Sequence, residues 1–480
     1  MIQSGNFGFL AIIPVALAVI LAFITKDAII ALLIACIVGL MIAGGGPAES
    51  FSLMGALKGI TNLPKLLEKT LGNQDFVWVL LIEVFIGVLI AFLRKTGSSQ
   101  EFERRMSTRI KTRKKAQIST WLFTLIIFSD YFTPLFVGAI FRGITDKARV
   151  SREKLSYILD SCSAPKSVLL PFTGWAVYTS SLLVGYGPIT DRTIALGLYI
   201  KAIPLDFYAI FALFLVPLIA LGVVPEFGPM KRAEKRAYLE GKPIRDGAIP
   251  LMSKELADIS KADQIIKPKI IMNFIVPLLI VFVVAIGTMI ITGTPKTLEA
   301  FMISSFFLGA ALFLERVPIR DIMETVLGGI KGVMPAVIIL ALAFAINSIS
   351  KDLGTATYVI EITKRWLTPS LLPLLTFAIA ALISFATGTS WGTFAIVIPI
   401  SIPLAFQFTG GKIALLVILT LSAICGGSVF GDHCSPVSDT TILASLGSAC
   451  DHIDHVRTQI PYAFLAAVVA AAVYLAIGVF

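Results

Sequence analysis

The chain has 480 residues, of which 56% are hydrophobic and only 15% are charged. Together with a mean hydropathy of +0.89, this composition excludes an ordinary soluble enzyme and favours an integral membrane protein. A net charge of +10 would also suit a nucleic-acid-binding protein. However, the basic residues gather in loops between apolar runs, as the positive-inside rule requires. We therefore expect membrane lipid around the chain and no nucleic-acid partner.

Apolar runs recur along the chain from its beginning to its end. A membrane-spanning helix needs about 20 apolar residues. No basic segment precedes the first run and no small-residue cleavage pattern follows it, so no cleaved signal peptide is expected. We predict an all-α polytopic protein of the cell membrane (plasma or inner membrane). The runs cover residues 7–24, 28–43, 76–93, 194–224, 270–291, 298–314, 333–349 and 461–480.

Two basic stretches lie close together in the first half. Residues 94–115 include nine Lys or Arg, and residues 142–154 are also basic, so both are expected in the cytoplasm. A single crossing cannot join two loops on the same side. Residues 116–141 are therefore predicted to form a re-entrant hairpin. Residues 371–408, interrupted by Thr-Gly-Thr-Ser-Trp-Gly-Thr, form the corresponding hairpin of the second half.

Two further segments are predicted to be broken helices. Asp-Ser-Cys-Ser-Ala-Pro, beginning at Asp160, interrupts the segment 155–184. Asp-His-Cys-Ser-Pro, beginning at Asp432, interrupts the segment 412–447. Unwound backbone at membrane depth is tolerated only where it is buried in protein or lines a wet cavity. Each break is therefore a candidate half of a binding site.

The similar breaks indicate an internal repeat. Five crossings and one hairpin in each half make an odd number of crossings, so the halves have opposite topology. We predict inverted repeats at 1–224 and 270–480, joined by a cytoplasmic linker at 225–269. The fold would contain about ten transmembrane helices, two re-entrant hairpins and broken helices meeting at the midplane, an architecture typical of secondary transporters.

No nucleotide-binding or zinc-protease motif competes with transport. The sequence lacks the Walker-type G-x-x-x-x-G-K-[ST] and H-E-x-x-H patterns, so we expect no enzymatic activity and no cofactor. Transport must then use an ion gradient or exchange. A channel is the weaker alternative, because two half-matching breaks suit alternating access better than one continuous pore.

Polar side chains at the breaks are the candidate site. Ionisable side chains at membrane depth mark functional positions by default, and hydroxyls, carboxylates and freed carbonyls are the oxygen ligands that hard cations prefer. The predicted ion- or substrate-binding residues are Asp130, Thr133, Asp160, Ser161, Ser163, Lys166, Asp206, Thr387, Gly388, Thr389, Ser390, Asp432, His433, Ser435 and Asp439.

A sodium ion is expected at Asp160, Thr389 and Asp432. The alternative is that the two carboxylates only cap half-helices, and that the small residues around Thr389 only pack helices. His452 and His455 are predicted to lie in a cytoplasmic loop, where they would tune activity to internal pH. A rival interpretation gives these histidines a zinc ion together with Cys434 and Cys450.

Several motifs resemble the NhaC-type sodium/proton antiporter family. FGDHCSPVSDTTILAS at 430–445, CDHIDHVRTQIPYA at 450–463 and TGTSWGT at 387–393 carry the resemblance, and SDYFTP, DSCSAP and IPLDFYA look like the first-half motifs. The resemblance covers the chain from about residue 76 onward. It implies a fold similar to the wider ion-transporter superfamily and Na⁺/H⁺ exchange with Na⁺ and H⁺ as coupling ions. The resemblance does not decide whether the protein forms a homodimer.

The same resemblance implies an alternative substrate, because relatives move malate, lactate or amino acids. In that alternative a small carboxylate or amino acid is transported, and Lys166 with the half-helix N-termini receives its carboxylate. Lys166 stands where the family has a small apolar residue, and Asp206 where asparagine is common.

Lys166 follows the proline of the first break and is therefore expected near the midplane. An uncompensated ammonium is costly there, so a carboxylate partner is expected among Asp130, Asp160 and Asp206. We expect Lys166 to take the place of one sodium ion. The alternative is a structural ion pair or a side chain that reaches the interface.

Overall fold

The computed structural model describes residues 7–25, 27–46, 52–127, 130, 132–171, 173–252, 269–292, 296–355, 358, 361–362 and 368–479. Within these ranges every regular element is a helix, apart from one isolated bridge between Pro250 and Asp451. Six of the described helices are long and apolar enough to cross a membrane, or up to eight if each of two bent pairs forms one span. The prediction of an all-α polytopic membrane protein is confirmed.

The first half contains most of the short helices. Its two long spans are α5 and the bent pair formed by α12 and α13. In chain order the elements are η1 (Gly8–Ile12), α1 (Ile13–Thr25), α2 (Ala28–Gly45), α3 (Leu53–Ile60), α4 (Leu63–Leu71), α5 (Gln74–Lys95), α6 (Ser98–Arg109), α7 (Arg113–Leu125), α8 (Phe132–Lys147), α9 (Arg152–Ser161), α10 (Ala164–Val168), α11 (Gly174–Leu183), α12 (Arg192–Ala202), η3 (Ile203–Leu205) and α13 (Phe207–Leu221).

The linker and the second half follow. The linker predicted at 225–269 contains the helix α14 (Gly228–Glu240). The second half begins with η4, one turn of π-helix. Its elements are η4 (Ile271–Ile275), α16 (Val276–Thr292), α17 (Thr297–Leu314), α18 (Ile319–Leu353), α20 (Leu372–Thr387), α21 (Ser390–Phe408), α22 (Leu415–Cys434), α23 (Asp439–Ser448) and α24 (His452–Val479).

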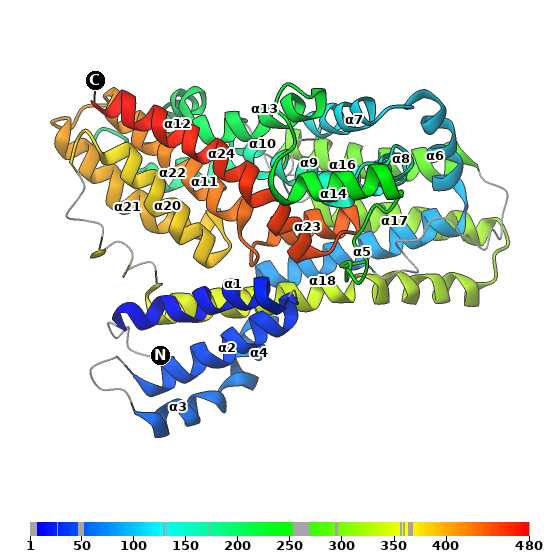
Figure 1. Ribbon diagram of the computed structural model, residues 1–480, viewed down its shortest axis with the longest axis horizontal. Helices are drawn as coiled ribbons and strands as arrows, with labels where there is room; N and C mark the ends of the chain where they lie inside the picture. Colours follow the sequence, from blue (N-terminus) through cyan, green and yellow to red (C-terminus); the bar gives the residue numbers. More distant parts are fainter. Residues whose placement is uncertain are drawn as a thin grey trace.

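One layer of the molecule is a series of helices joined by successive contacts: α1, α2, α18, α5, α17 and α16. Figure 1 shows α1, α2, α5 and α18 of this layer together in its lower part. The centre of the layer is the contact between α5 and α18. A Cβ built on Gly87 would lie 2.5 Å from the carbonyl oxygen of Gly329, so only glycine allows this approach. The rings of Phe76 and Phe344 meet further along, with centroids 5.6 Å apart. Because Phe76 precedes Gly87 whereas Phe344 follows Gly329, the two helices are antiparallel.

The helix–helix contacts come in pairs. In each pair, the second contact is the first with every helix replaced by its equivalent from the other half. In the first layer α2 packs against α18 while α17 packs against α5. A second layer contains α7, α9, α13, α20, α22 and α24. In it α7 packs on α13 while α20 packs on α24, and α9 packs on α24 while α22 packs on α13. With the antiparallel α5–α18 pair at the centre, this is the packing of inverted repeats. The repeat boundaries near 224 and 270 remain predictions.

The two hairpins open toward opposite faces. Arg113, at the start of α7, pairs with Glu234 of the linker helix. Arg149, just after α8, donates to a backbone carbonyl of the same linker helix over 3.2 Å. In the second hairpin Ser370 abuts Gly478 at the far end of α24, and the last turn of α21 packs against the loop between α11 and α12. The first hairpin therefore opens at the linker and the second at the opposite face.

The predicted breaks are present, with bounds that differ from the expected ones. The first hairpin is formed by α7 and α8, and positions 128, 129 and 131 of its tip lie outside the described residues. The segment expected at 155–184 is broken twice, between α9 and α10 and again before α11. The long span at 194–224 is also broken: α12 and α13 meet at 46°, with Asp206 at the bend.

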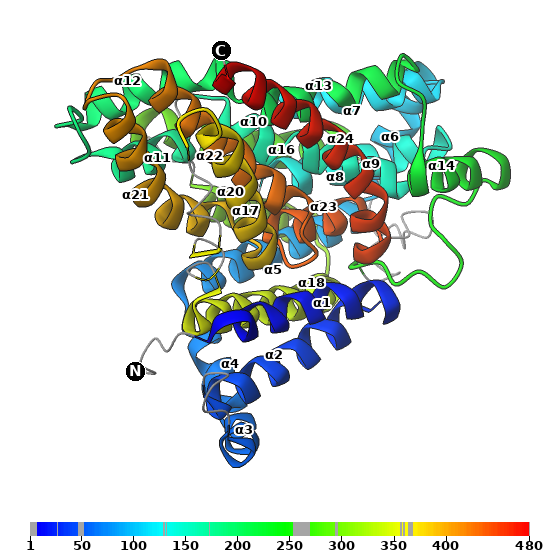
Figure 2. The same ribbon diagram turned by 60° about the vertical axis from the view of Figure 1, so that its left-hand side comes forward.

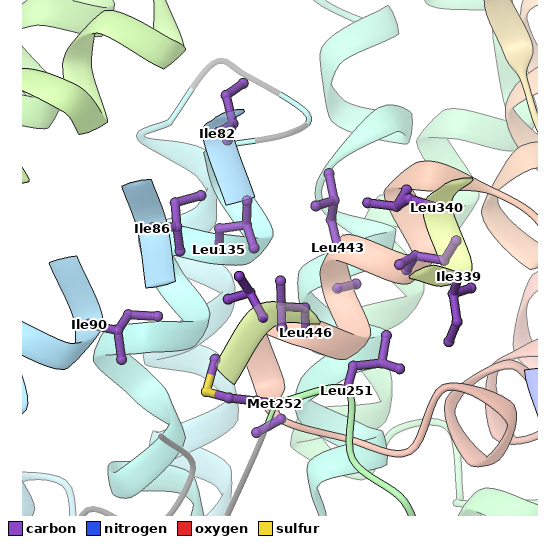
Figure 3. Packing of buried hydrophobic residues seen from close by; sticks show 14 of the residues in the cluster. Ile82, Ile86, Ile90, Leu135, Leu251, Met252, Ile339, Leu340, Leu443 and Leu446 are labelled. Carbon is purple, nitrogen blue, oxygen red and sulfur yellow. The ribbon is translucent and has the colours of Figure 1, made fainter. Parts of the chain in front are cut away.

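The helix α23 lies between the two layers (Figure 2). Its Leu443 and Leu446 join a cluster with Ile86 of α5, Leu135 of α8 and Leu340 of α18 (Figure 3). In a membrane such contacts act through close packing rather than through transfer from water. The second broken helix is thus held against the first hairpin and the α5–α18 pair at once.

The linker binds both halves at one face. Arg236 of α14 donates from Nη2 to both carboxylate oxygens of Glu153 at 2.9 Å, in the first turn of α9. Arg245 pairs with Asp454, in the first turn of α24, at 2.8 Å. Residues 253–268 of the predicted linker lie outside the described residues. Within the described part, the linker fastens the start of a first-half helix to the start of a second-half helix.

This arrangement predicts which loops share a side. All five cysteines are buried, so single cysteines can be placed at exposed positions against a low labelling background. Cysteines at Arg104 of α6 and Lys242 of the linker should react with an impermeant maleimide from the same side of the membrane. A cysteine at Lys412, between α21 and α22, should react from the other side. Labelling of Arg104 and Lys242 positions from opposite sides would contradict the inverted arrangement.

A pH dependence follows from the buried pair at the linker. Burial raises the pKa of Glu153 to about 6, against the lowering effect of the Arg236 guanidinium. Because the folded pKa exceeds the ordinary value of 4.5, the native state binds the proton more tightly, and stability from this group rises as pH falls from 6 toward 4.5.

Replacing Glu153 with Gln should remove that dependence. The stability difference between wild type and Glu153→Gln should shift by about 1–2 kcal/mol between pH 7 and pH 4.5, in favour of the wild type at the lower pH. Melting temperatures of both purified proteins across this pH range measure the shift. A difference that does not change with pH would contradict the prediction.

Candidate functional site

The two broken helices meet at their breaks. α9 ends at Ser161 and α22 ends one residue after His433. The hydroxyl of Ser161 lies 3.0 Å from Nε2 of His433. Nδ1 of the same ring lies 2.7 Å from the hydroxyl of Tyr208 in α13. All three side chains are buried, so His433 ties both broken helices to the bent span.

Asp432 faces the tip of the second hairpin. Its Oδ2 accepts hydrogen bonds from the hydroxyl of Ser390 at 2.7 Å and from the Ser390 backbone N–H at 3.3 Å. Ser390 is the first residue of α21, and free N–H groups and the helix dipole favour an anion there. Among the described residues, Asp432 Oδ1 has no hydrogen-bond partner, and neither has the hydroxyl of Ser428 one turn earlier on α22.

Asp160 lies in a different group of partners. Its Oδ2 accepts a hydrogen bond from Nε2 of Gln459 in α24 at 2.7 Å, and Nε2 of His455 is 3.7 Å away. The Gln459 amide also donates to the backbone carbonyl of His433. One α24 side chain therefore joins the Asp160 break to the Asp432 break. Asp160 and Asp432 are also within electrostatic range of each other.

The histidines of α24 extend this network. Oε1 of Gln459 lies 2.8 Å from Nε2 of His455. The Ser445 hydroxyl of α23 lies 2.8 Å from Nδ1 of His455 and 3.0 Å from Nδ1 of His452. Nε2 of His452 in turn lies 2.8 Å from the carbonyl oxygen of Pro436. The chain of hydrogen bonds thus runs from one break, through α24 and α23, to the other break.

The expected place of these histidines was wrong. His452 and His455 do not lie in a solvent-facing loop: they occupy the first turn of α24 and are 2% and 0% exposed. The apolar run was expected to start at 461, but the helix starts at 452 because its polar first turns face buried polar partners. Among the described residues, no group of three or more His, Cys, Asp or Glu side chains is arranged to hold a metal ion.

Lys166 reaches the tip of the first hairpin. Its ammonium donates to the carbonyl oxygen of Thr124 at 2.7 Å, to that of Ile127, and to the hydroxyl of Thr133 at 3.1 Å. An ammonium has three N–H groups, so all of them have acceptors here. Freed carbonyls at the end of α7 thus supply its hydrogen-bond acceptors. Of the three carboxylates expected as partners, Asp130 lies within electrostatic range of the ammonium.

The carboxylates proposed for Lys166 have other partners. Oδ2 of Asp130 accepts a hydrogen bond from the Trp175 indole at 2.9 Å. Oδ1 of Asp206 accepts from the backbone N–H of Ala209 at 3.1 Å and so caps α13. Asp206 packs beside Gly426 of α22, one to two turns before Asp432. It therefore lies beside the second broken helix.

The predicted sodium ligands do not form one group. Thr389 caps α21, accepting the N–H of Gly392 at 3.3 Å, whereas the neighbouring Ser390 contacts Asp432. Asp160 belongs to the α24 network described above. The structure therefore places Asp432 and Ser390 together, with Asp160 and Thr389 each bound elsewhere.

The other predicted residues shape the breaks through the backbone. Gly388 adopts φ +65° as the cap of α20, and a Cβ there would lie 2.4 Å from the Val437 carbonyl. Ser435 donates to the Phe385 carbonyl at 2.7 Å, which ties the break to the hairpin. The hydroxyls of Ser163 and Thr387 donate to carbonyls four residues earlier in the chain, those of Leu159 and Ile383. Asp439 accepts the N–H of Thr440 and lies within electrostatic range of Asp432.

The segment Gly388–Thr389–Ser390–Trp391–Gly392 also has the spacing G-x-S-x-G, which in hydrolases places a nucleophilic serine between a strand and a helix. Here the segment joins two helices, α20 and α21, and the serine hydroxyl donates to a carboxylate and accepts nothing from a histidine in the described contacts. The spacing therefore carries no hydrolase function at this position.

Four site residues were not predicted from the sequence: Gln459, Ser445, Tyr208 and Trp175. Gln459 follows His455 by four positions, which places both on one helix face, so helical spacing could have found it. Ser445, Tyr208 and Trp175 reach the site only through tertiary packing. No local pattern distinguishes them from ordinary core residues.

Comparison with known proteins agrees with this architecture. A model of the Na⁺/H⁺ antiporter family matches residues 186–479. The chain belongs to this family. A protein of Haemophilus influenzae without an assigned function is 33% identical over 98% of this chain and 90% of its own length. The family resemblance predicted from the motifs is thereby confirmed, and the protein is a multi-pass secondary antiporter of the cell membrane that moves ions or small solutes.

More distant relatives match part of the chain. The malate-2H⁺/Na⁺-lactate antiporter of Bacillus subtilis is 31% identical over 33% of each chain. The arginine/ornithine antiporter of Halobacterium salinarum is 32% identical over 30% of this chain and 28% of its own length. The chain is therefore similar, over about a third of its length, to antiporters named for different substrates.

The network around Gln459 gives a direct test of the site. Replacing Gln459 with Leu leaves the Asp160 carboxylate and the His433 carbonyl without their donor, at a cost of about 1–3 kcal/mol for each buried group. We expect a lower melting temperature and at least about a tenfold loss of transport. Thr458→Val is the matched control, because that hydroxyl bonds only within its own helix. Equal effects of the two substitutions would contradict a special role for Gln459.

Proposed function

We propose that this antiporter exchanges Na⁺ for H⁺ by alternating access, with Asp432 as the group that both ions share. One observation carries the proposal. Asp432 is buried, its Oδ2 is bonded to the Ser390 hydroxyl, and its Oδ1 has no hydrogen-bond partner among the described residues. Asp160 Oδ1 also lacks a partner there, but its Oδ2 is bonded to the Gln459 amide rather than to a hydroxyl. A carboxylate oxygen beside hydroxyl groups suits a small hard cation and suits a proton equally well.

The geometry supports competition between the two ions. Ser390 fixes Oδ2, so the carboxylate presents Oδ1 in a constant direction, with the Ser428 hydroxyl one helical turn away. An uncompensated carboxylate at membrane depth is costly, so it favours a bound cation during each reorientation. Na⁺ and H⁺ would then be alternative ligands of one group, which is the condition for exchange.

The second hairpin would respond to this binding. Asp432 of α22 accepts a hydrogen bond from the first N–H of α21, and the Ser435 hydroxyl donates to a carbonyl in the last turn of α20. A cation at Oδ1 would neutralise the carboxylate and so weaken its electrostatic attraction to the N-terminus of α21. Binding is thus connected with the hairpin tip, which opens toward the face opposite the linker.

A carboxylate substrate receives no support from Lys166. All three of its N–H groups are directed to oxygens of the first hairpin, so the ammonium offers no donor to a solute carboxylate in this arrangement. The substrates named for the distant relatives belong to those proteins. A solute panel in the assay below would reveal organic transport.

The proposal is tested in proteoliposomes that contain a pH-sensitive dye. An inward Na⁺ gradient should drive proton efflux and make the lumen alkaline, and the response should saturate with Na⁺. Malate, lactate, arginine and ornithine, added without Na⁺, should leave the luminal pH unchanged. Proton movement driven by one of these solutes and indifferent to Na⁺ would overturn the proposal.

Replacing Asp432 with Asn tests the shared group. The amide keeps the shape but removes the charge, so exchange should fall by at least about a hundredfold, since a charged group at membrane depth cannot be substituted by a neutral ligand. Asp191→Asn is the control: Asp191 caps α12 at an exposed position, accepting two backbone N–H groups at 2.8 and 3.0 Å. If Asp432→Asn and Asp191→Asn both retain exchange, Asp432 is only a helix cap.

A further inference from the structure

The Lys166 ammonium sits in a cage of oxygens that the first hairpin supplies. The carbonyls come from Thr124, in the last turn of α7, and from Ile127, just after it, and the hydroxyl comes from Thr133 on α8. Lys166 itself is 4% exposed and both threonines are fully buried. Two carbonyls and one hydroxyl are the ligand set that a hard cation selects, and carbonyls at a helix C-terminus attract positive charge.

The lysine is neither half of an ion pair nor a side chain that reaches water. Asp130 is within electrostatic range of Lys166, but its Oδ2 is bonded to Trp175, and among the described residues the ammonium donates to two carbonyls and one hydroxyl. The buried ammonium also excludes the alternative in which it extends to the membrane interface. Its partners are those of a bound cation.

The second half lacks such a side chain. When the two breaks are aligned on their prolines, Pro165 with Pro436, the residue opposite Lys166 is Val437. In that half Asp432 Oδ1 and the Ser428 hydroxyl have no hydrogen-bond partner among the described residues. Buried oxygens without a hydrogen-bond partner occur in both halves, since Asp160 Oδ1 and the Ser167 hydroxyl also lack one among the described residues. The halves differ in that only the first carries a lysine after the proline of its break.

We infer that the first-hairpin cage is a sodium-type cation site that the chain fills permanently with its own Lys166. Only the second-half pocket would then take Na⁺ from solution, so each cycle moves one Na⁺ fewer than a protein with two open pockets. The assignment of the second pocket rests on the proposed function. The assignment of the cage rests on the contacts of Lys166 alone.

Emptying the cage should make it bind Na⁺. In Lys166→Ala the three oxygens lose their cation and leave space for Na⁺ with water. Purified wild type and variant are compared by ²²Na⁺ binding and by melting temperature in NaCl against choline chloride at equal ionic strength. We expect the variant to bind one additional Na⁺ per chain and to be stabilised by Na⁺ more than the wild type is. An unchanged number of bound Na⁺ in folded Lys166→Ala protein would overturn the inference.

Two more variants separate the cage from a general packing role. Lys166→Met fills the space without charge and should gain no Na⁺. Thr133→Val in the Lys166→Ala background removes one ligand and should weaken the new Na⁺ binding about tenfold, the usual effect of one lost hydrogen-bonding ligand. Thr133→Val alone should leave Na⁺ binding as in the wild type. If Lys166→Met gains Na⁺ as Lys166→Ala does, the new site is not the cage and the inference fails.

These measurements also separate the two proposals. If wild type shows no Na⁺/H⁺ exchange but Lys166→Ala gains a bound Na⁺ that depends on Thr133, the proposed function fails and the cage stands. If wild type exchanges Na⁺ for H⁺ and Lys166→Ala gains nothing, the proposed function stands and the cage fails. In an active Lys166→Ala protein, the Hill coefficient for Na⁺ should rise from about one toward two, as one added site requires.

Discussion

Backbone groups freed by a helix break cannot stay unpaired inside a membrane, and much of this structure follows from that constraint. The first hairpin ends α7 with open carbonyls, and a lysine from the neighbouring broken helix supplies donors to them. The second hairpin begins α21 with open N–H groups, and an aspartate from the other broken helix accepts from one of them. Each break is thus stabilised by a charged side chain of the sign that its helix end attracts.

A second consequence is that the two breaks are connected rather than independent. His433 bonds the end of α9 through Ser161 and the start of α13 through Tyr208. Gln459 bonds Asp160 and the carbonyl of His433 from α24. Because these side chains are hydrogen-bonded to one another across the two breaks, moving one break without the other would leave polar groups unsatisfied, at a cost of about 1–3 kcal/mol each. The two breaks are therefore expected to move together.

Hydrophobic runs, basic loops and the paired Asp-x-Cys-Ser motifs were enough to predict the helical class, the two hairpins and the inverted order, because charge placement and span length act locally. The sequence could not predict the hydrogen-bond acceptors of Lys166, since they are mainly backbone carbonyls and every residue has one. Local signals also failed for His452 and His455: a polar helix start reads as a loop unless its buried partners, Ser445 and Gln459, are known. Thr389 and Ser390 are neighbours, and which of them contacts Asp432 depends on the residue at which α21 begins.

The charges of Lys166 at the first hairpin tip and Asp432 at the second determine whether the proposed exchange would be electroneutral. With the second pocket empty, Lys166 and Asp432 together carry no net charge, and either Na⁺ or H⁺ on Asp432 leaves the same single positive charge on the pair. Exchange of one ion for the other at this carboxylate is then electroneutral in both directions, because the loaded forms differ only in which cation is bound. A second open Na⁺ pocket would break that balance. On the two proposals above, a lysine fixed in the first cage would preserve it, since a tethered cation would fill the oxygens and would not be released.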